Sequence, residues 1–286
     1  MIDFHTHIVP PAMKQDREAY FADPLFRSLY SSPKAKLATA EDLIASMDKN
    51  GVDVSVVLNI GWSNQSLCVR TNDYLMESVA HHKTRLAGFG TVVLSAGESA
   101  LNEVERCSRG GLLGIGEMRL DRSLLSAQTE EILVHFVQVL TSAKMPLLVH
   151  SSEPVGHQYP GKWDTTPDVL YRLITEFPEL SLICAHWGGG LPFYGLMPEV
   201  KNALSRVHFD TAASPYLYEP QVYKQVIQIL GAKSILFGSD YPLMSPGRLL
   251  REIRSLGLPA ETEESLLAGN ARLLLEALAG EQGMGG

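Results

Sequence analysis

Short apolar runs alternate with longer amphipathic stretches from one end of the chain to the other. Parallel strands joined by crossover helices produce this pattern, because such strands are buried on both faces and the helices on only one. We find eight apolar runs, at residues 2–4, 54–59, 86–92, 113–118, 146–150, 180–185, 207–210 and 234–237. They predict eight strands.

Amphipathic stretches of helical length lie between these runs. They predict helices over residues 40–49, 71–82, 99–108, 129–143, 166–176, 196–205, 221–230 and 248–256. Gly51, Pro178 and Gly231 follow three of these stretches, and glycine and proline commonly stand just beyond helix ends. A further helix over 261–278 is expected to pack on the outside.

Eight β/α units predict a single closed barrel of the α/β class, a (β/α)₈ TIM barrel with one extra C-terminal helix. The 286 residues suit this fold, since such barrels commonly form one domain of roughly 250 residues. We expect a metal-dependent barrel domain over 1–280 and a flexible, Gly-rich tail over 281–286. The long connection at 8–39 is expected to cover a substrate at the C-terminal ends of the strands.

The composition of the chain argues against several classes of function. The chain has 24 Lys and Arg against 32 Asp and Glu, a net charge of −8, and so lacks the basic surface typical of nucleic-acid-binding proteins. Its three cysteines form no CxxC pair, and the sequence shows neither a signal segment nor an apolar stretch of membrane-spanning length. We therefore expect a cytoplasmic protein that acts on a small molecule and could form a homo-oligomer, with no nucleic-acid or membrane partner.

The pair His5 and His7 stands at the end of the first predicted strand. Alternate residues of a strand share a face, so both imidazoles can reach one metal ion. Other metal-competent side chains end or closely follow further predicted strands: Glu117, His150, His186 and Asp240. Because strand ends converge at the mouth of a barrel, this placement favours a metal site over histidines packed in the core.

With these motifs, the sequence resembles the amidohydrolase superfamily of metal-dependent hydrolases, and in particular its amidohydrolase-related branch. The resemblance covers essentially the whole chain. Its motifs are HTH at 5–7, GEMRLD at 116–121, LLVH at 147–150, CAHWGGG at 184–190 and FGSDYP at 237–242. It implies that His5, His7 and Asp240 hold one metal, that His150 and His186 hold a second metal or serve catalysis, and that Asp240 takes a proton from the attacking water.

The number of metal ions stays open between one and two. Phosphotriesterases and dihydroorotases bridge two ions with a carboxylated lysine on the fourth strand, where this chain has Glu117. A glutamate there is similar to the bridging carboxylate of TatD-type deoxyribonucleases and favours two ions, although their Gly-Leu-Asp is replaced by Arg119-Leu120-Asp121. The branch similar to aminocarboxymuconate-semialdehyde decarboxylase uses one zinc and leaves the sixth-strand histidine free. Imidazole and carboxylate ligands suit Zn²⁺ best, with Mn²⁺, Ni²⁺ or Fe²⁺ as alternatives.

The leading hypothesis for the activity is hydrolysis of a small polar lactone, amide or ester. A divalent metal lowers the pKa of a bound water to about 7 and so generates hydroxide at neutral pH. Asp240 would be the general base, with His186 as a second catalytic candidate. The alternatives are a non-oxidative decarboxylase of a small unsaturated or aromatic acid, and a barrel that binds metal without turnover.

The loop after the fifth strand carries many polar and aromatic residues, and loops at this face of a barrel determine substrate choice. Its candidates for substrate binding are Glu153, His157, Tyr159 and Lys162. Three more lie one or two positions after proposed ligands: Arg119, Trp187 and Tyr241. Arg119 is the best suited to pair with a carboxylate, because its guanidinium can bind both oxygens.

Overall fold

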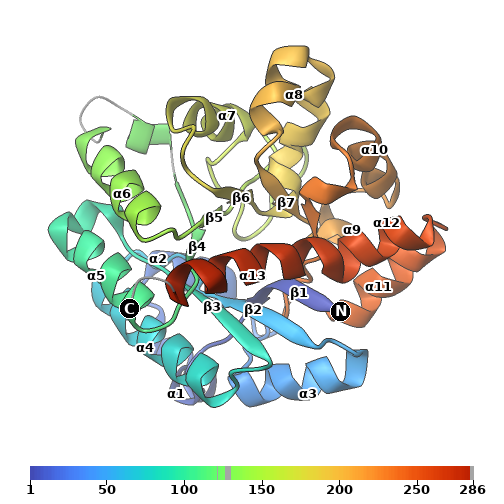
Figure 1. The fold of residues 1–286 in the computed structure, drawn as a ribbon. Helices are drawn as coiled ribbons and strands as arrows, with labels where there is room; N and C mark the ends of the chain where they lie inside the picture. Colours follow the sequence, from blue (N-terminus) through green and yellow to red (C-terminus); the bar gives the residue numbers. More distant parts are fainter. Residues whose placement is uncertain (121, 126–129, 284–286) are drawn as a thin grey trace.

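The computed structural model describes residues 1–120, 122–125 and 130–283 and contains eight parallel strands with helices around them (Figure 1). The strands are β1 (Ile2–His7), β2 (Val54–Leu58), β3 (Leu86–Gly90), β4 (Gly114–Met118), β5 (Leu147–Val149), β6 (Leu182–Cys184), β7 (His208–Asp210) and β8 (Ile235–Leu236). They pair in sequence order from β1 to β8. Each lies within or over one of the expected apolar runs.

The ring of strands closes between β8 and β1. Phe4 N donates to Phe237 O at 2.7 Å, and Asp240 N donates to His5 O at 2.8 Å. Thr6 forms a parallel bridge with Tyr241, just beyond β8. The chain is therefore a (β/α)₈ TIM barrel, as the alternation predicts.

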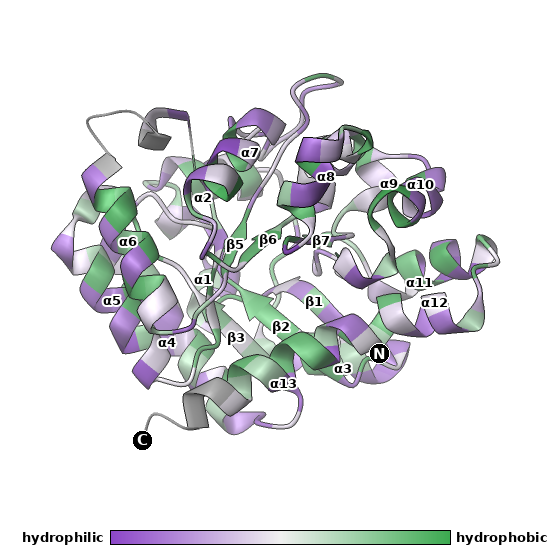
Figure 2. Cartoon of the chain, turned by 45° about the horizontal axis from the view of Figure 1, so that its top comes forward, coloured by the Kyte–Doolittle hydropathy of each residue, from purple (hydrophilic) through white to green (hydrophobic). Residues whose placement is uncertain are grey.

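The helices that cover the barrel also match the expected ones. They are α3 (Ala40–Asn50), α4 (Gln65–His81), α5 (Glu98–Arg109), α6 (Glu130–Ser142), α7 (Pro167–Glu176), α8 (Pro198–Leu204), α10 (Gln221–Leu230) and α11 (Pro246–Ser255). The expected start of the fourth helix, Thr129, lies outside the described residues. In Figure 2 the strands β2, β5 and β6 are largely green, whereas the outer helices carry green and purple bands, as expected for helices buried on one side.

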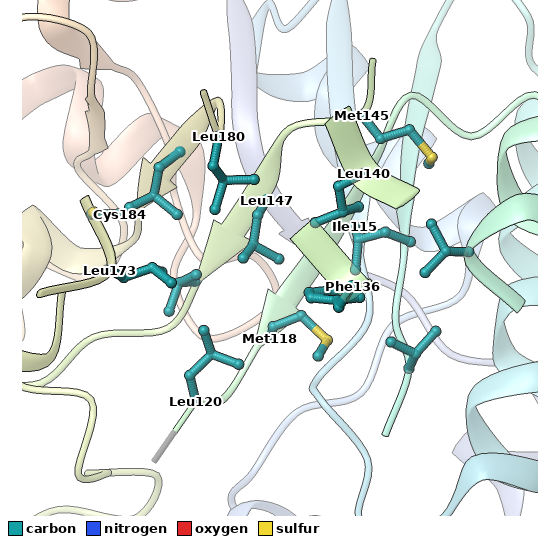
Figure 3. Close-up of a cluster of buried hydrophobic side chains, with 14 of the residues drawn as sticks. Ile115, Met118, Leu120, Phe136, Leu140, Met145, Leu147, Leu173, Leu180 and Cys184 are labelled. Atoms are coloured by element: carbon teal, nitrogen blue, oxygen red, sulfur yellow. The ribbon is translucent and has the colours of Figure 1, made fainter. Parts of the chain in front are cut away.

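Apolar side chains fill two layers of the molecule. Inside the ring, residues such as Phe4, Leu58 and Leu148 belong to one buried cluster. A second cluster fills the space between strands and helices, and Figure 3 shows its part around β4 and β5. This double layer holds the strand ends in fixed positions at the barrel mouth.

The C-terminal segment forms α12 (Ala260–Glu264), a π-helical turn η6 (Ser265–Gly269) and α13 (Asn270–Gly283). The expectation that it packs on the outside of the barrel is wrong. Ala271 and Leu278 belong to the same cluster as Ile2 and Leu236, and Figure 1 shows α13 crossing one end of the ring. The apolar interior would otherwise be exposed at that end. The helix continues to Gly283, past the expected end at residue 278, and residues 284–286 of the expected tail lie outside the described part.

The connection at 8–39 is folded rather than open. It contains α1 (Pro11–Gln15), the short turn η1 (Glu18–Tyr20) and α2 (Pro24–Tyr30). Asp23 caps α2 by accepting hydrogen bonds from Leu25 N and Phe26 N, both at 3.0 Å. The Phe26 ring stacks on Trp62 with centroids 5.2 Å apart. These contacts fix the connection against the loop after β2.

Short elements complete the described chain. The turns are η2 (Leu94–Ala96), η3 (Arg122–Leu125), η4 (His186–Leu196) and η5 (Ala232–Ser234), and the helix α9 (Ser214–Leu217) follows β7. Within the described ranges, no helix is both long and apolar enough to span a bilayer.

Candidate metal centre

Two of the strands that carry candidate ligands are irregular. The pairing of β1 with β2 shifts register between Asp3 and Thr6, and that of β4 with β5 shifts between Ile115 and Met118. Such irregularities in strand pairing re-aim side chains and are common next to active sites. In β1, next to this shift, Phe4 lies in the apolar barrel interior, and His5 and His7 lie close to the candidate ligand Asp240.

The first group of ligands consists of His5, His7 and Asp240. The two Nε2 atoms of the histidines are 3.1 Å apart. Asp240 Oδ1 lies 3.3 Å from His7 Nε2 and 3.9 Å from His5 Nε2. Metal–ligand bonds of about 2.0–2.2 Å separate neighbouring ligands of one ion by roughly 3–4 Å, so the three donor atoms fit a single divalent ion. Two imidazoles and a carboxylate are ligand types that such ions prefer.

Asp210 fixes the orientation of His5. Its Oδ2 lies 2.8 Å from His5 Nδ1, while its Oδ1 accepts hydrogen bonds from His186 N at 2.9 Å and Ala212 N at 3.0 Å. Burial lowers the pKa of His5, but Asp210, Glu117 and Asp240 outweigh it and raise this pKa to about 10. The same carboxylates that favour a proton on His5 also favour a metal cation beside it.

Glu117 joins the remaining histidines. Its Oε1 accepts hydrogen bonds from His150 Nδ1 at 2.7 Å and His186 Nε2 at 3.1 Å. The Glu117 carboxylate also lies 3.9 Å from His5 Nε2 and 3.8 Å from His7 Nε2. Although burial raises the pKa of Glu117, the histidines lower it well below its usual value. His5, Glu117 and His186 therefore form a second group that could hold a metal.

Hydrogen-bond partners define the protonation of His186. Its Nδ1 lies 3.1 Å from the carbonyl oxygen of Ala212, and its Nε2 faces the Glu117 carboxylate. Both partners only accept hydrogen bonds, so both ring nitrogens carry a proton in this arrangement. Burial lowers the pKa of His186, but Glu117 and Asp240 raise it above its ordinary value.

His150 has the opposite character. Burial and the nearby Arg119 lower the pKa of His150 to about 4. Its Nδ1 donates to Glu117, and its Nε2 accepts from the Ser152 hydroxyl at 3.3 Å. His150 therefore lies in the same cluster as the other candidates but belongs to neither three-ligand group among the described residues.

The turns that carry His186 and Asp240 have unusual backbones. His186, Trp187 and Asp240 have φ of 54°, 58° and 63°, a left-handed conformation that is uncommon outside glycine and clusters at functional sites. Gly189, at φ 59°, could not be replaced freely, because an added Cβ would lie 2.4 Å from Ser152 O. The glycines after His186 thus let this turn approach the loop after β5.

A cavity of about 440 Å³ adjoins the ligand cluster, and His7, Glu117, His150, His186 and Asp240 line one part of it. The other walls come from the connection before α3 and from the loops after β2, β4, β5, β7 and β8. They include Tyr30, Lys34, Lys36, His157, Tyr159, Tyr216 and Leu243. The connection at 8–39 thus lines the cavity.

The expected substrate-binding residues divide into two sets. Arg119, His157 and Tyr159 line the cavity. The other four, which are Glu153, Lys162, Trp187 and Tyr241, are not among its lining residues, and each has a hydrogen-bond partner. Glu153 accepts from the Tyr159 hydroxyl at 2.9 Å, and Lys162 donates to Val155 O at 2.8 Å. Trp187 donates to Ser214 Oγ at 2.6 Å, and Tyr241 donates to Asp42 O at 3.1 Å. Trp187 is fully buried in a hydrophobic cluster.

Sequence reasoning missed Asp210 and Tyr30. Asp210 ends the seventh predicted strand, so the rule that selected Glu117 could have selected it too. Tyr30 stands at the end of α2 within the long connection, where no sequence pattern ties it to the barrel mouth.

Comparisons with known proteins identify the family and agree with the fold. The sequence profile of the family described as "Amidohydrolase" matches residues 2–276. A 2-amino-3-carboxymuconate-6-semialdehyde decarboxylase of Dictyostelium discoideum is 21% identical and aligns over 94% of this chain and 90% of its own. A solved 5-carboxyvanillate decarboxylase from Sphingomonas paucimobilis superposes with a TM-score of 0.76 at 19% identity, covering 96% of this chain and 98% of its own.

A third similar protein was solved with a bound metal ion. The 5-carboxyvanillate decarboxylase of Novosphingobium aromaticivorans was solved with manganese and 4-hydroxy-3-methoxy-5-nitrobenzoic acid; it has a TM-score of 0.75 and 18% identity, and covers 96% of this chain and 95% of its own. Together with the ligand groups found here, it supports a divalent metal as the cofactor and a small molecule as the substrate.

These relatives overturn the expectation of a hydrolase that cleaves a lactone, amide or ester, because their named activities are decarboxylations. The error has a physical origin. Histidine and carboxylate ligands at a barrel mouth predict a metal, but they do not determine which bond of a substrate is broken. The decarboxylase alternative is the one that the relatives favour. The chain is an enzyme that belongs to the amidohydrolase family, whose profile spans nearly its full length.

Proposed function

We propose that this enzyme catalyses the non-oxidative decarboxylation of a small unsaturated or aromatic acid. The observation that carries the proposal is a cavity of about 440 Å³ whose wall contains His7, Asp240 and His186. Such a volume suits a ligand of one ring with substituents. The names of relatives that cover more than nine-tenths of the chain support this reaction class.

We further propose a single metal ion, in place of the two that Glu117 suggests from sequence. Both three-ligand groups include His5. His5 Nδ1 is committed to Asp210, so only Nε2 remains as a ligand. Because one nitrogen lone pair binds one ion, the two three-ligand groups are alternative sets of ligands for the same ion. The group of His5, His7 and Asp240 is the better site, because Glu117 Oε1 is already hydrogen-bonded to two histidines. The donor set suits both Zn²⁺ and Mn²⁺.

The charges around the cavity favour an acid as substrate. Apart from Glu117 and Asp240, the described lining residues include no carboxylate, whereas Lys34, Lys36 and Arg119 are cationic. This local positive charge contrasts with the net charge of −8 for the chain. Clefts lined by one sign of charge concentrate ligands of the opposite sign.

The reaction needs no oxidant or reductant. The bond between the substrate carbon and its carboxylate breaks, the electron pair stays on that carbon, carbon dioxide leaves, and the carbon takes up a proton. A bound divalent ion supplies positive charge that orients and polarises the acid. His186, with protons on both ring nitrogens and its side chain at the cavity, is placed to supply the proton. Glu117 and Ala212 O keep its ring in position.

Carbon dioxide release tests this function directly. Metal-loaded protein is incubated in D₂O with 2,6-dihydroxybenzoate and with 5-carboxyvanillate, and the products are followed by mass spectrometry. We expect carbon dioxide and a product with one deuterium on carbon. His186→Asn should keep the metal but slow the reaction by about 100-fold or more. His81→Asn, at an exposed histidine of α4, is the matched control and should react like the wild type.

Two results would contradict the proposal. One is the absence of carbon dioxide from every aromatic and unsaturated acid tried with metal-loaded protein. The other is full activity after the metal has been removed by a chelator, since the site would then have no part in the reaction.

A further inference from the structure

The guanidinium of Arg119 is a cation without a carboxylate partner among the described residues. Its hydrogen bonds go to backbone carbonyls, from Nη1 to Gly161 O at 2.8 Å and from Nε to Ile60 O at 3.4 Å. The group also lies over the Trp163 ring, 5.9 Å from its centroid. It is only partly accessible, and burial lowers the pKa of Arg119. A cation withdrawn from water is unfavourable unless an anion pairs with it.

Arg119 lines the same cavity as the candidate metal ligands. Tyr30 lines it from α2, and its hydroxyl has no hydrogen bond to any described residue. The Tyr30 ring is held by Phe26, with centroids 4.8 Å apart, and Phe26 is in turn stacked on Trp62. Two hydrogen-bond donors on fixed elements, Arg119 and Tyr30, therefore remain available for a ligand in this cavity.

The chemistry of decarboxylation indicates which anion Arg119 should hold. The departing carboxylate loses its charge in the transition state, because its electron pair moves onto carbon. A guanidinium bound to that carboxylate would stabilise the substrate more than the transition state and so slow the reaction. A second anionic group keeps its charge throughout, and binding it to Arg119 anchors the substrate without this penalty.

We propose that Arg119 is a specificity-determining residue that binds a second carboxylate, which the substrate retains. This inference rests on the proposed function and narrows it: the preferred substrates are diacids, and Tyr30 supplies a further hydrogen bond beside the retained carboxylate. Lys34 and Lys36, which line the same cavity from an exposed segment, add to the attraction for doubly charged acids.

Binding of two matched acids tests the proposal without turnover. Isothermal titration compares benzene-1,3-dicarboxylate with benzoate on metal-loaded protein. The acids share the ring and one carboxylate, and the 1,3 arrangement prevents both carboxylates from reaching one ion. We expect the diacid to bind at least about tenfold more tightly, a charge-assisted contact beyond the twofold statistical advantage of two carboxylates.

The variant Arg119→Met should lower the affinity for the diacid much more than the affinity for benzoate, and so remove this preference. Lys162→Met is the matched control: the Lys162 ammonium donates to Val155 O and His157 O, and Lys162 is not a lining residue, so the preference should persist. If Arg119→Met does not fold by circular dichroism, Arg119→Lys replaces it and should retain part of the preference, which high salt should then weaken.

Equal affinity of the wild type for the two acids would overturn the proposal. So would an equal loss of affinity for both acids in Arg119→Met, because Arg119 would then bind the carboxylate that they share. Both outcomes are independent of carbon dioxide release. A failure of the proposed reaction and a failure of this inference can therefore be told apart.

Discussion

At the scale of single residues, Asp210 connects the parts of the site. One of its oxygens contacts His5 Nδ1, and the other accepts hydrogen bonds from His186 N and Ala212 N. A carboxylate behind a ligand histidine fixes the ring orientation and makes the ligand nitrogen more basic. Asp210 thereby aligns the metal ligand His5 and the turn that carries His186.

Replacing this carboxylate should weaken metal binding. Asp210→Asn keeps the size of the side chain but removes its charge, and we expect the metal affinity to fall about 10- to 100-fold. Competition with a chromogenic chelator measures the change. Asp48→Asn, at an exposed aspartate paired with Arg85, should bind metal like the wild type. An unchanged affinity in Asp210→Asn would show that Asp210 does not support the ligand.

A simple rule from the sequence predicts which candidate side chains lie close together. His5, His7, Glu117, His150, His186 and Asp240 all come together because parallel strands end at one mouth. This rule about strand ends does not predict which ring nitrogen of a histidine faces the metal. The Nδ1 of His150 faces Glu117, a residue that is distant in the sequence and becomes its neighbour only in the fold. The rule also cannot separate ligands from supporting carboxylates such as Asp210.

At the scale of secondary-structure elements, the start of α3 joins the long connection to the barrel. Asp42 Oδ2 accepts from Thr39 N at 2.7 Å and from Lys14 Nζ at 2.6 Å, so it forms part of the capping box of α3 and an ion pair with α1. These contacts, led by the hydrogen bond from Lys14, lower the pKa of Asp42.

The pKa shift of Asp42 has a defined sign for stability. A lowered pKa means that the ionised form stabilises the fold above the unfolded-state pKa of about 3.9, and that this contribution disappears as the pH falls through the folded-state value. Because solvent screens this partly exposed carboxylate, Asp42→Asn should cost at most about 1 kcal/mol of unfolding free energy at pH 7, and the difference from the wild type should shrink towards pH 3. Urea unfolding at several pH values measures it.

The matched control for this prediction is Glu18→Gln, at an exposed residue of the same connection. It should leave the unfolding free energy within about 0.5 kcal/mol of the wild type at every pH. A loss in Asp42→Asn that stayed constant from pH 7 to pH 3 would assign the effect to packing rather than to charge.

Element boundaries show where sequence patterns stop being informative. The helix α4 begins six residues before the expected position, because Asn64 accepts hydrogen bonds from Ser66 N at 2.9 Å and Leu67 N at 3.3 Å and so caps an earlier turn. The helices α1 and α2 have 5 and 7 residues, too few to show a helical period. Asn270, at the start of α13, donates to Ala232 O at 2.8 Å and to Ile235 O at 2.7 Å and so ties α13 to β8, a contact that no local sequence pattern indicates.

At the scale of the whole molecule, α13 closes one end of the barrel (Figure 1). The ligand cluster and the cavity are formed by residues at the C-terminal ends of the strands and in the loops that follow them. The alternation of strands and helices predicts the ring. It does not predict the closure, because an amphipathic C-terminal helix could cover the outer surface equally well. The deciding contacts are those of Ala271 and Leu278 with the barrel interior.

The closing helix should contribute strongly to stability. Leu278 is 6% exposed and Leu273, on the same helix, is 70% exposed. Leu278→Ala leaves a cavity against the barrel interior and should lower the unfolding free energy by about 2–5 kcal/mol, whereas Leu273→Ala should change it by less than about 0.5 kcal/mol. Urea unfolding of the two variants tests this. Similar, small losses in both would mean that α13 does not seal the barrel.

The number and position of metal ions test the account most directly. Elemental analysis of metal-replete protein, combined with anomalous diffraction from its crystals, counts the ions and locates them. We predict one divalent ion per chain, bound by His5 Nε2, His7 Nε2 and Asp240, beside the cavity that Arg119 lines. Two ions bridged by Glu117, or one ion that His5 does not touch, would contradict the account.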